Sequence, residues 1–133
     1  MLGMADRRSR THDRERSTRH LRVGRDGETI AAAFLERRGA RIVGRNVRVG
    51  RDEIDLVVEF AGQRVAVEVK TATAEGRSAE GHDARPEENF DDAKVARIRR
   101  AAARLDPPAF RIDLVAIVMD PDGVGVRWSP AAG

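Results

Sequence analysis

The stretch "DEIDLVVEFAGQRVAVEVK", residues 52–70, decides the fold. Two runs rich in β-branched and other apolar residues flank Ala61-Gly62-Gln63, which is the pattern of a β-hairpin. Because side chains alternate between the two faces of a strand, the second run sends its valines to one face and Glu68 and Lys70 to the other. In the first run Asp55 lies on the face opposite an apolar set. That set is Ile54, Leu56 and Val58.

The turn decides how the charged side chains of the two runs meet. A two-residue loop at Ala61-Gly62 pairs Asp55 with Glu68, whereas a loop at Gly62-Gln63 pairs Asp55 with Lys70. The second loop has glycine at the position that a type II′ turn prefers. Both registers place Asp55, Glu68 and Lys70 on one face of the hairpin.

Two carboxylates that lie this close repel each other, and a bound cation relieves the repulsion. Mg²⁺ prefers oxygen ligands and is often held by one or two carboxylates, water and a substrate phosphate. Asp55 and Glu68 are therefore candidate metal ligands, and the backbone carbonyl of Val69 is a candidate third. Lys70 is placed to orient or deprotonate an attacking water, a role that arginine cannot fill in the same way.

The alternative interpretation is a solvent-exposed strand face, on which alternating charged residues are common. Val57 and Ala66 argue against full exposure, because they share the face with the charged side chains. A helix that covers part of this face would bury the carboxylates partly, and buried carboxylates need a partner. The sequence alone leaves both interpretations open.

The flanking sequence predicts the remaining elements and their order. An apolar stripe with helical spacing follows Asp26, a candidate N-cap, and ends at Gly39, and Glu28 lies in its first turn. Gly44 marks a candidate β-bulge in the strand that follows. The expected helices span 27–38 and 91–105, and a long loop spans 72–90. The expected strands span 40–49, 53–60, 64–71, 110–119 and 124–128.

Composition and charge limit the class of protein. The 133 residues suffice for one domain, and the absence of cysteine excludes disulfides and thiolate metal sites. No apolar run reaches the length of about 20 residues that a membrane span needs, so we expect a cytoplasmic protein without membrane partners. Residues 1–22 carry seven arginines against three acidic residues, and we expect a disordered, Arg-rich tail before a single domain over 23–133. Only two of the 25 basic residues are lysines, Lys70 and Lys94.

In combination these motifs resemble the PD-(D/E)XK nuclease superfamily. The closer likeness is to the YraN-like family of uncharacterised bacterial proteins, which are related to archaeal Holliday junction resolvases. The matching pieces are "GETIAAAFLERRGARIVGRNVR" (27–48), "EIDLVV" (53–58), "VAVEVKT" (65–71), the "K-x-x-R-I" helix (94–98) and "RIDLVAI" (111–117).

The resemblance implies an α/β fold with a restriction-endonuclease-like core, a mixed central β-sheet flanked by helices in the order αβββαββ. By similarity, Asp55 and Glu68 are metal ligands and Lys70 is the catalytic lysine. Glu28 is then the acidic residue that the first helix contributes to the site. Arg111 and Asp113 match a family pattern with a structural or substrate-adjacent role.

The implied function is a Mg²⁺-dependent (or Mn²⁺-dependent) endonuclease that cleaves DNA phosphodiester bonds, with branched or repair intermediates as candidate substrates. The alternative is a non-catalytic nucleic-acid-binding or adaptor protein that retains the nuclease fold. A homodimer is a further option, by analogy with the resolvases alone. Two departures from the family pattern weaken the expected grip on DNA: Ala72 stands where a basic residue is usual, and the 72–90 loop is acidic.

Overall fold

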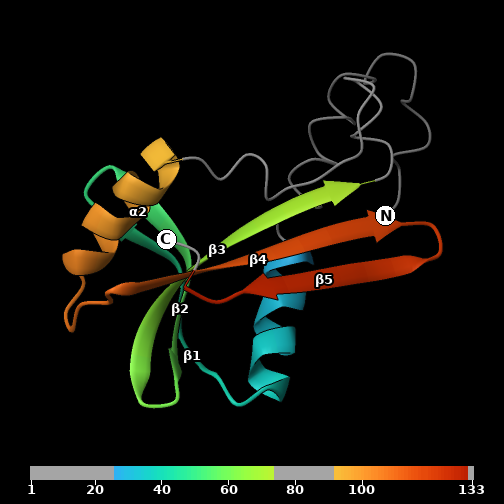
Figure 1. The fold of residues 1–133 in the computed structure, drawn as a ribbon, viewed down its shortest axis with the longest axis horizontal. Coiled ribbons are helices and arrows are strands. Elements are labelled where there is room, and N and C mark those ends of the chain that lie inside the picture. The colour runs from blue at the N-terminus through green and yellow to red at the C-terminus, as the bar shows by residue number, and fades with distance from the viewer. Residues whose placement is uncertain (1–25, 74–91, 132–133) are drawn as a thin grey trace, which may run out of the picture.

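The computed structural model describes residues 26–73 and 92–131 (Figure 1). The N-terminal helix covers residues 26–37, and the second helix is α2 (Asp92–Ala103). The strands are β1 (Arg41–Val49), β2 (Asp52–Phe60), β3 (Gln63–Thr73), β4 (Arg111–Asp120) and β5 (Gly123–Ser129). The predicted order of helices and strands is confirmed, and their bounds agree within two residues. The predicted tail and most of the 72–90 loop lie outside the described residues.

The five strands form one mixed sheet in the order β1-β2-β3-β4-β5. Only β3 and β4 are parallel, and the other neighbours are antiparallel. Parallel neighbours need a long crossover connection, and α2 lies within the connection between β3 and β4 (Figure 1). This confirms the predicted restriction-endonuclease-like α/β class. Among the described residues, no helix combines the length and the apolarity that crossing a bilayer requires.

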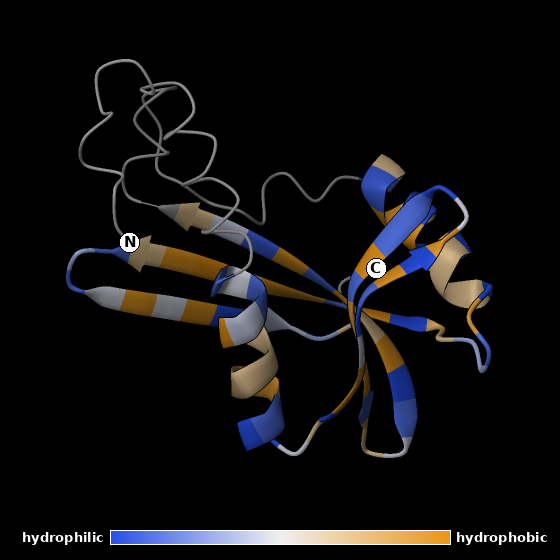
Figure 2. Ribbon diagram, turned by 180° about the vertical axis from the view of Figure 1, so that it is seen from behind, coloured by the Kyte–Doolittle hydropathy of each residue, from blue (hydrophilic) through white to orange (hydrophobic). Residues whose placement is uncertain are grey.

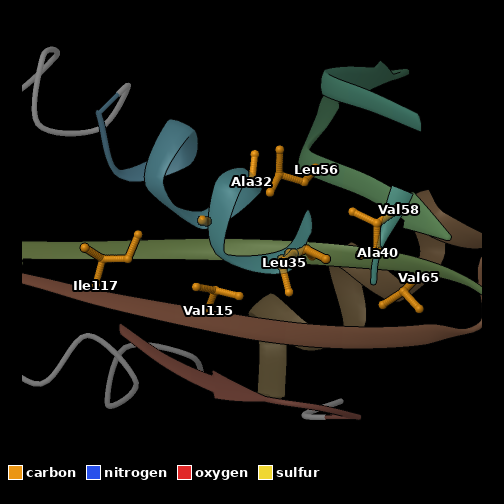
Figure 3. Packing of buried hydrophobic residues seen from close by; sticks show 10 residues of the cluster. Ala32, Leu35, Ala40, Leu56, Val58, Val65, Val115 and Ile117 are labelled. Atoms are coloured by element: carbon orange, nitrogen blue, oxygen red, sulfur yellow. The ribbon is translucent and has the colours of Figure 1, made fainter. Parts of the chain in front are cut away.

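The N-terminal helix packs on one face of the sheet through a cluster of buried apolar side chains (Figure 3). The helix contributes Ala31, Ala32 and Leu35 to this cluster, and each of them is at most 7% exposed. Full burial of a leucine or valine side chain contributes about 1.5–3 kcal/mol, so this cluster fixes the helix on the sheet. The sheet residues of the cluster are Leu56, Val58, Val65, Val67, Val115 and Ile117.

The helix α2 covers part of the opposite face with Ile98, Ala101 and Ala102. They pack with Val57 and Ala66 of the hairpin, so the face that carries the charged side chains is partly covered. Figure 2 shows hydrophilic and hydrophobic segments along the hairpin strands, whereas β4 is hydrophobic over most of its length. Because α2 covers part of the face that carries the charged side chains, this face is not fully exposed to solvent.

One predicted face assignment is wrong. Ile54 packs in the cluster under α2, whereas its expected companions Leu56 and Val58 pack under the N-terminal helix. The pairing of β2 with β3 ends at Leu56, and in the register with β1 the residue across from Asp55 is Asn46, whose φ is 51°. Asn46, in this left-handed conformation, interrupts the regular geometry of β1. Beside it, the side chains of β2 change faces between Ile54 and Leu56.

The hairpin adopts the register in which the loop is Ala61-Gly62, since Phe60 pairs with Gln63. Both loop residues have positive φ, 54° for Ala61 and 76° for Gly62. Two positive φ angles define a type I′ turn, whose twist matches that of the flanking strands. The type II′ turn with the loop Gly62-Gln63, which the position of the glycine favoured, is therefore not formed.

The predicted bulge in β1 is confirmed. The register with β2 shifts between Ile42 and Gly44, which makes Val43 the extra residue. A Cβ atom on Gly44 would lie 2.8 Å from Cγ2 of Val47, so the bend leaves no room for a side chain there. The glycine signal in the sequence thus marked a position with a steric cause.

Asp113 has a structural role on the face away from Glu68 and Lys70. Its side chain is 2% exposed and accepts hydrogen bonds from Arg111 Nε (2.9 Å), Arg111 Nη2 (3.0 Å), Trp128 Nε1 (2.9 Å) and the Ala131 amide (2.7 Å). Four donors satisfy a buried carboxylate and tie β4 to β5 and the residues after it. Of the structural and substrate-adjacent roles expected for Arg111 and Asp113, these contacts support the structural one.

Candidate functional site

Asp55 and Glu68 lie at the fork where β2 leaves β3. The pairing of the two strands runs from Phe60 with Gln63 to Leu56 with Val67, and the next residues along are Asp55 and Glu68. At the fork, Oδ2 of Asp55 accepts a hydrogen bond of 2.8 Å from the backbone amide of Val69. The Asp55 side chain therefore takes the place of a strand partner for β3, which fixes its carboxyl group beside Glu68.

The pKa of Asp55 is raised from 3.8 to about 7. Burial is the largest cause, and repulsion from Glu68 is the next. The amide of Val69 acts in the opposite direction, while Glu28 and a hydrogen bond to Glu68 raise the value further. Without a cation, the carboxyl group of Asp55 thus keeps its proton up to near neutral pH, because burial and the neighbouring carboxylate disfavour its charged form.

Lys70 is paired with Glu68. Its Nζ lies 3.2 Å from Oε2 of Glu68, and the two side chains are 22% and 16% exposed. Burial lowers the pKa of Lys70, but the negative charges of Glu68 and Asp55 oppose this effect, and the pKa is raised above its usual value. Lys70 is therefore an ammonium ion at neutral pH, which suits orienting a group or neutralising charge and not the removal of a proton from water.

Lys94 of α2 is a neighbour of the site that sequence reasoning did not include. It lies next to Lys70, so the two lysines of the chain meet at this point. A signal was present in the sequence, because lysine is so rare among the basic residues here. The two lysines and the two carboxylates form a compact cluster of opposite charges.

Glu28 lies at the margin of the cluster. The helix start packs against β3, because a Cβ atom on Gly27 would lie 2.1 Å from Oγ1 of Thr71. Glu28 is partly buried and close enough to raise the pKa of Asp55, although its effect is smaller than that of Glu68. Within the described ranges, no group of three or more His, Cys, Asp or Glu side chains is arranged to hold a metal ion. Glu28 thus stands beside the carboxylate pair without completing a three-residue set.

The donor set of Asp55 and Glu68 fits a hard divalent cation. Both offer carboxylate oxygens, and the pKa of Asp55 is raised by burial and then by repulsion from Glu68, two effects that a bound cation would oppose. Mg²⁺ is commonly held by one or two carboxylates and completes its octahedron with waters and substrate phosphate. The carbonyl of Val69 stays a predicted ligand, while its amide has the separate task of fixing Asp55.

Two of the arginines near the site have partners in the protein. Asp52, at the start of β2, forms an ion pair with Arg97 of α2 at 3.7 Å. Arg45 of β1 donates a hydrogen bond of 3.1 Å from Nη2 to Oγ1 of Thr29 in the N-terminal helix. The first pair links α2 to β2, and the second links the N-terminal helix to β1.

The match to a family model and the matches to related sequences identify the same protein family. The model of the uncharacterised protein family UPF0102 matches residues 27–117. A UPF0102 protein of Symbiobacterium thermophilum is 38% identical over 102 residues, which cover 77% of this chain and 86% of the relative. One of an Arthrobacter species is 40% identical over 107 residues, or 76% and 86% of the two chains. One of Syntrophus aciditrophicus is 33% identical over 112 residues, or 84% and 88%.

Among solved structures, the fold is similar to that of Pyrococcus furiosus SfsA in complex with Ca²⁺. The sequence identity is 19% and the TM-score is 0.37. The matched region covers 84% of this chain and 63% of that chain, which is less than two thirds of its length.

Proposed function

We propose that this chain, which belongs to the uncharacterised protein family UPF0102, is a Mg²⁺-dependent or Mn²⁺-dependent nuclease acting on DNA phosphodiester bonds. The family is a member of the PD-(D/E)XK-like nuclease superfamily, and the mixed sheet with flanking helices agrees with that fold. Branched and repair intermediates are the substrates we would try first.

One observation carries the proposal. Asp55 and Glu68 converge at the fork of β2 and β3, and Lys70 lies 3.2 Å from Glu68 on the same face. Such a cluster has little value as a purely structural device, because burial and the repulsion from Glu68 raise the pKa of Asp55 and so cost stability when it is ionised. Strained charge pairs of this kind concentrate at functional sites.

The residues of the chain would divide the work as follows. The Val69 amide holds Asp55 beside Glu68, where the two carboxylates would hold the metal ion. When bound, a divalent ion supplies Lewis acidity toward the scissile phosphate and lowers the pKa of a water nucleophile. The ammonium group of Lys70 would stabilise the negative charge that develops on the phosphoryl oxygens. The ammonium group of Lys94, on α2 next to Lys70, would add to the same positive charge.

Cleavage assays test the proposal. Labelled four-way junctions and flaps are incubated with Mg²⁺ or Mn²⁺, with wild-type protein and with the variants Asp55→Ala and Lys70→Ala. We expect each variant to lose at least about 100-fold in rate, as enzymes do when a preorganised electrostatic group is removed. Arg37→Gln, an exposed change in the last turn of the N-terminal helix, is the matched control and should cut normally. Equal cleavage by Asp55→Ala and wild type would remove the proposed mechanism.

A second function has one observation in its favour. The described residues hold only a pair of converging carboxylates and not a set of three, which suits a fold that binds nucleic acid without cutting it. A non-catalytic binding or adaptor protein would retain DNA in EDTA, with an affinity that falls steeply with salt and does not depend on Asp55. The cleavage assay and a binding assay on the same variants separate the two functions.

A further inference from the structure

A hollow of about 320 Å³ lies over β4 and β5. Among the described residues, its lining is small and apolar except for one arginine. The lining residues are Ala116, Val118, Gly125, Val126 and Arg127. The helix α2 contacts β2 and β4 near one end of the sheet, and the far parts of β3, β4 and β5 extend away from it (Figure 1). This hollow therefore lies on the part of the sheet that α2 leaves open.

The strand register places the hollow beside the carboxylate cluster. Lys70 of β3 pairs with Ala116 of β4, and Ala116 pairs with Arg127 of β5. Directly paired residues point to the same side of a sheet, so Lys70 and Arg127 share a face with Ala116 between them. Neighbouring strands are about 4.8 Å apart, which puts the two basic residues about 10 Å apart across the sheet.

The chemistry of this row suits a chain of phosphates. Arg127 is exposed, and its planar guanidinium can bind a phosphate through two parallel hydrogen bonds. Gly125 and Ala116 keep the floor between the basic residues low, so that a backbone can approach the sheet closely. A lone small anion would use one cation, whereas two cations at this spacing match a polyanion that runs across the strands.

We propose that a DNA strand lies across this hollow and that Arg127 binds a phosphate of the backbone beside the scissile phosphate, which would lie at the cluster of Asp55, Glu68 and Lys70. The inference rests on the proposed function, since it adds a backbone-binding subsite to the same site. Binding at the subsite needs no metal ion, so it can be measured in EDTA, apart from metal binding and cleavage.

Two variants test the two parts of the subsite. Arg127→Gln removes the charge from an exposed side chain, and Arg37→Gln removes the same charge from the N-terminal helix, which packs on the other face of the sheet. Gly125→Leu would fill the hollow; among the described residues, the one atom near a Cβ atom on Gly125 is the carbonyl oxygen of Val118, at 4.0 Å. Val124→Leu enlarges a 52% exposed neighbour whose side chain points to the other face of β5, and it is the matched control.

The measurement is fluorescence anisotropy of a labelled DNA duplex in EDTA over a range of salt concentrations. We expect Arg127→Gln to weaken binding about three- to eightfold at 0.1 M salt and to reduce the salt slope by about 0.9, the value for one phosphate contact. Gly125→Leu should weaken binding to a similar degree, and both controls should bind like wild type.

Equal losses in Arg127→Gln and Arg37→Gln would overturn the proposal, because they would indicate general charge attraction. Unchanged binding by Gly125→Leu would also overturn it. Mn²⁺ binding, followed by calorimetry, should be unchanged in Arg127→Gln. A protein that binds DNA through Arg127 but does not bind Mn²⁺ would keep the subsite and remove the nuclease function, so the two failures are distinguishable.

Discussion

Replacing Asp55 by asparagine should stabilise the protein at alkaline pH. Asparagine keeps an oxygen that can accept the hydrogen bond from the Val69 amide, but it carries no charge to be buried beside Glu68. The variant therefore removes the repulsion without leaving a cavity. A residue whose change improves stability while it abolishes function is a mark of a functional site.

The size of the effect follows from the pKa of Asp55. Its rise from 3.8 to about 7 corresponds to at most about 4 kcal/mol. Because the side chain keeps some contact with water, we expect about half of this, roughly 2 kcal/mol. In the folded state the carboxyl holds its proton more tightly than in the unfolded chain. The wild type therefore loses stability as the pH rises from about 4 to about 7 and loses no more above that range.

The assay is urea unfolding followed by circular dichroism, in EDTA, at pH 5 and pH 8. Asp55→Asn should be more stable than wild type by roughly 2 kcal/mol at pH 8 and by under about 1 kcal/mol at pH 5. Glu53→Gln changes an exposed carboxylate on the same strand and should stay within about 0.5 kcal/mol of wild type. A gain in Asp55→Asn that does not depend on pH, or a clear loss at pH 8, would refute the reasoning.

Three further predictions concern the fold that positions the site. Ala61→Asn should stabilise the protein by about 0.5–1 kcal/mol in urea unfolding, because Asn-Gly is the preferred pair for a type I′ turn; a loss would argue against the positive φ of Ala61. Gly27→Ala should destabilise the protein, because the new Cβ atom would meet Oγ1 of Thr71 at 2.1 Å, and Thr71→Ala in the same chain should restore part of the loss; if the double variant is no better than the single one, the contact is not the cause. Asp113→Ala should cost about 3–5 kcal/mol, because Arg111 loses its buried partner; thermal unfolding within a few degrees of wild type would contradict this role.

Local patterns in the sequence were sufficient to predict the hairpin and most of the cluster. Alternation along β3 places Ala66, Glu68 and Lys70 on one face. Ala66 packs under α2, which confirms that this is the face that α2 partly covers. The register was left open, because two turn types fit the same residues and nothing in the sequence indicates that Ala61 takes a positive φ. The choice depends on the twist of the strands, which is a property of the whole sheet.

The errors and omissions have long-range causes. Ile54 was assigned to the wrong face, because the turn of β2 depends on Asn46 across the sheet and on the end of pairing with β3. Lys94 was not included, because its contact with Lys70 joins α2 to β3 through the tertiary fold. Arg127 is beside the site only because β5 pairs with β4, which pairs with β3. None of these contacts can be predicted from the spacing of residues along the chain.

Calorimetric titration with Mn²⁺ at pH 8 tests most directly whether Asp55 and Glu68 hold a divalent ion. The measurement compares wild type with Glu68→Gln, and Glu53→Gln is the control on an exposed carboxylate. We predict a binding isotherm for wild type and for the control, and at least about tenfold weaker binding for Glu68→Gln, which lacks one of the two charged ligands. Heats and affinity in Glu68→Gln that equal those of wild type would contradict the site.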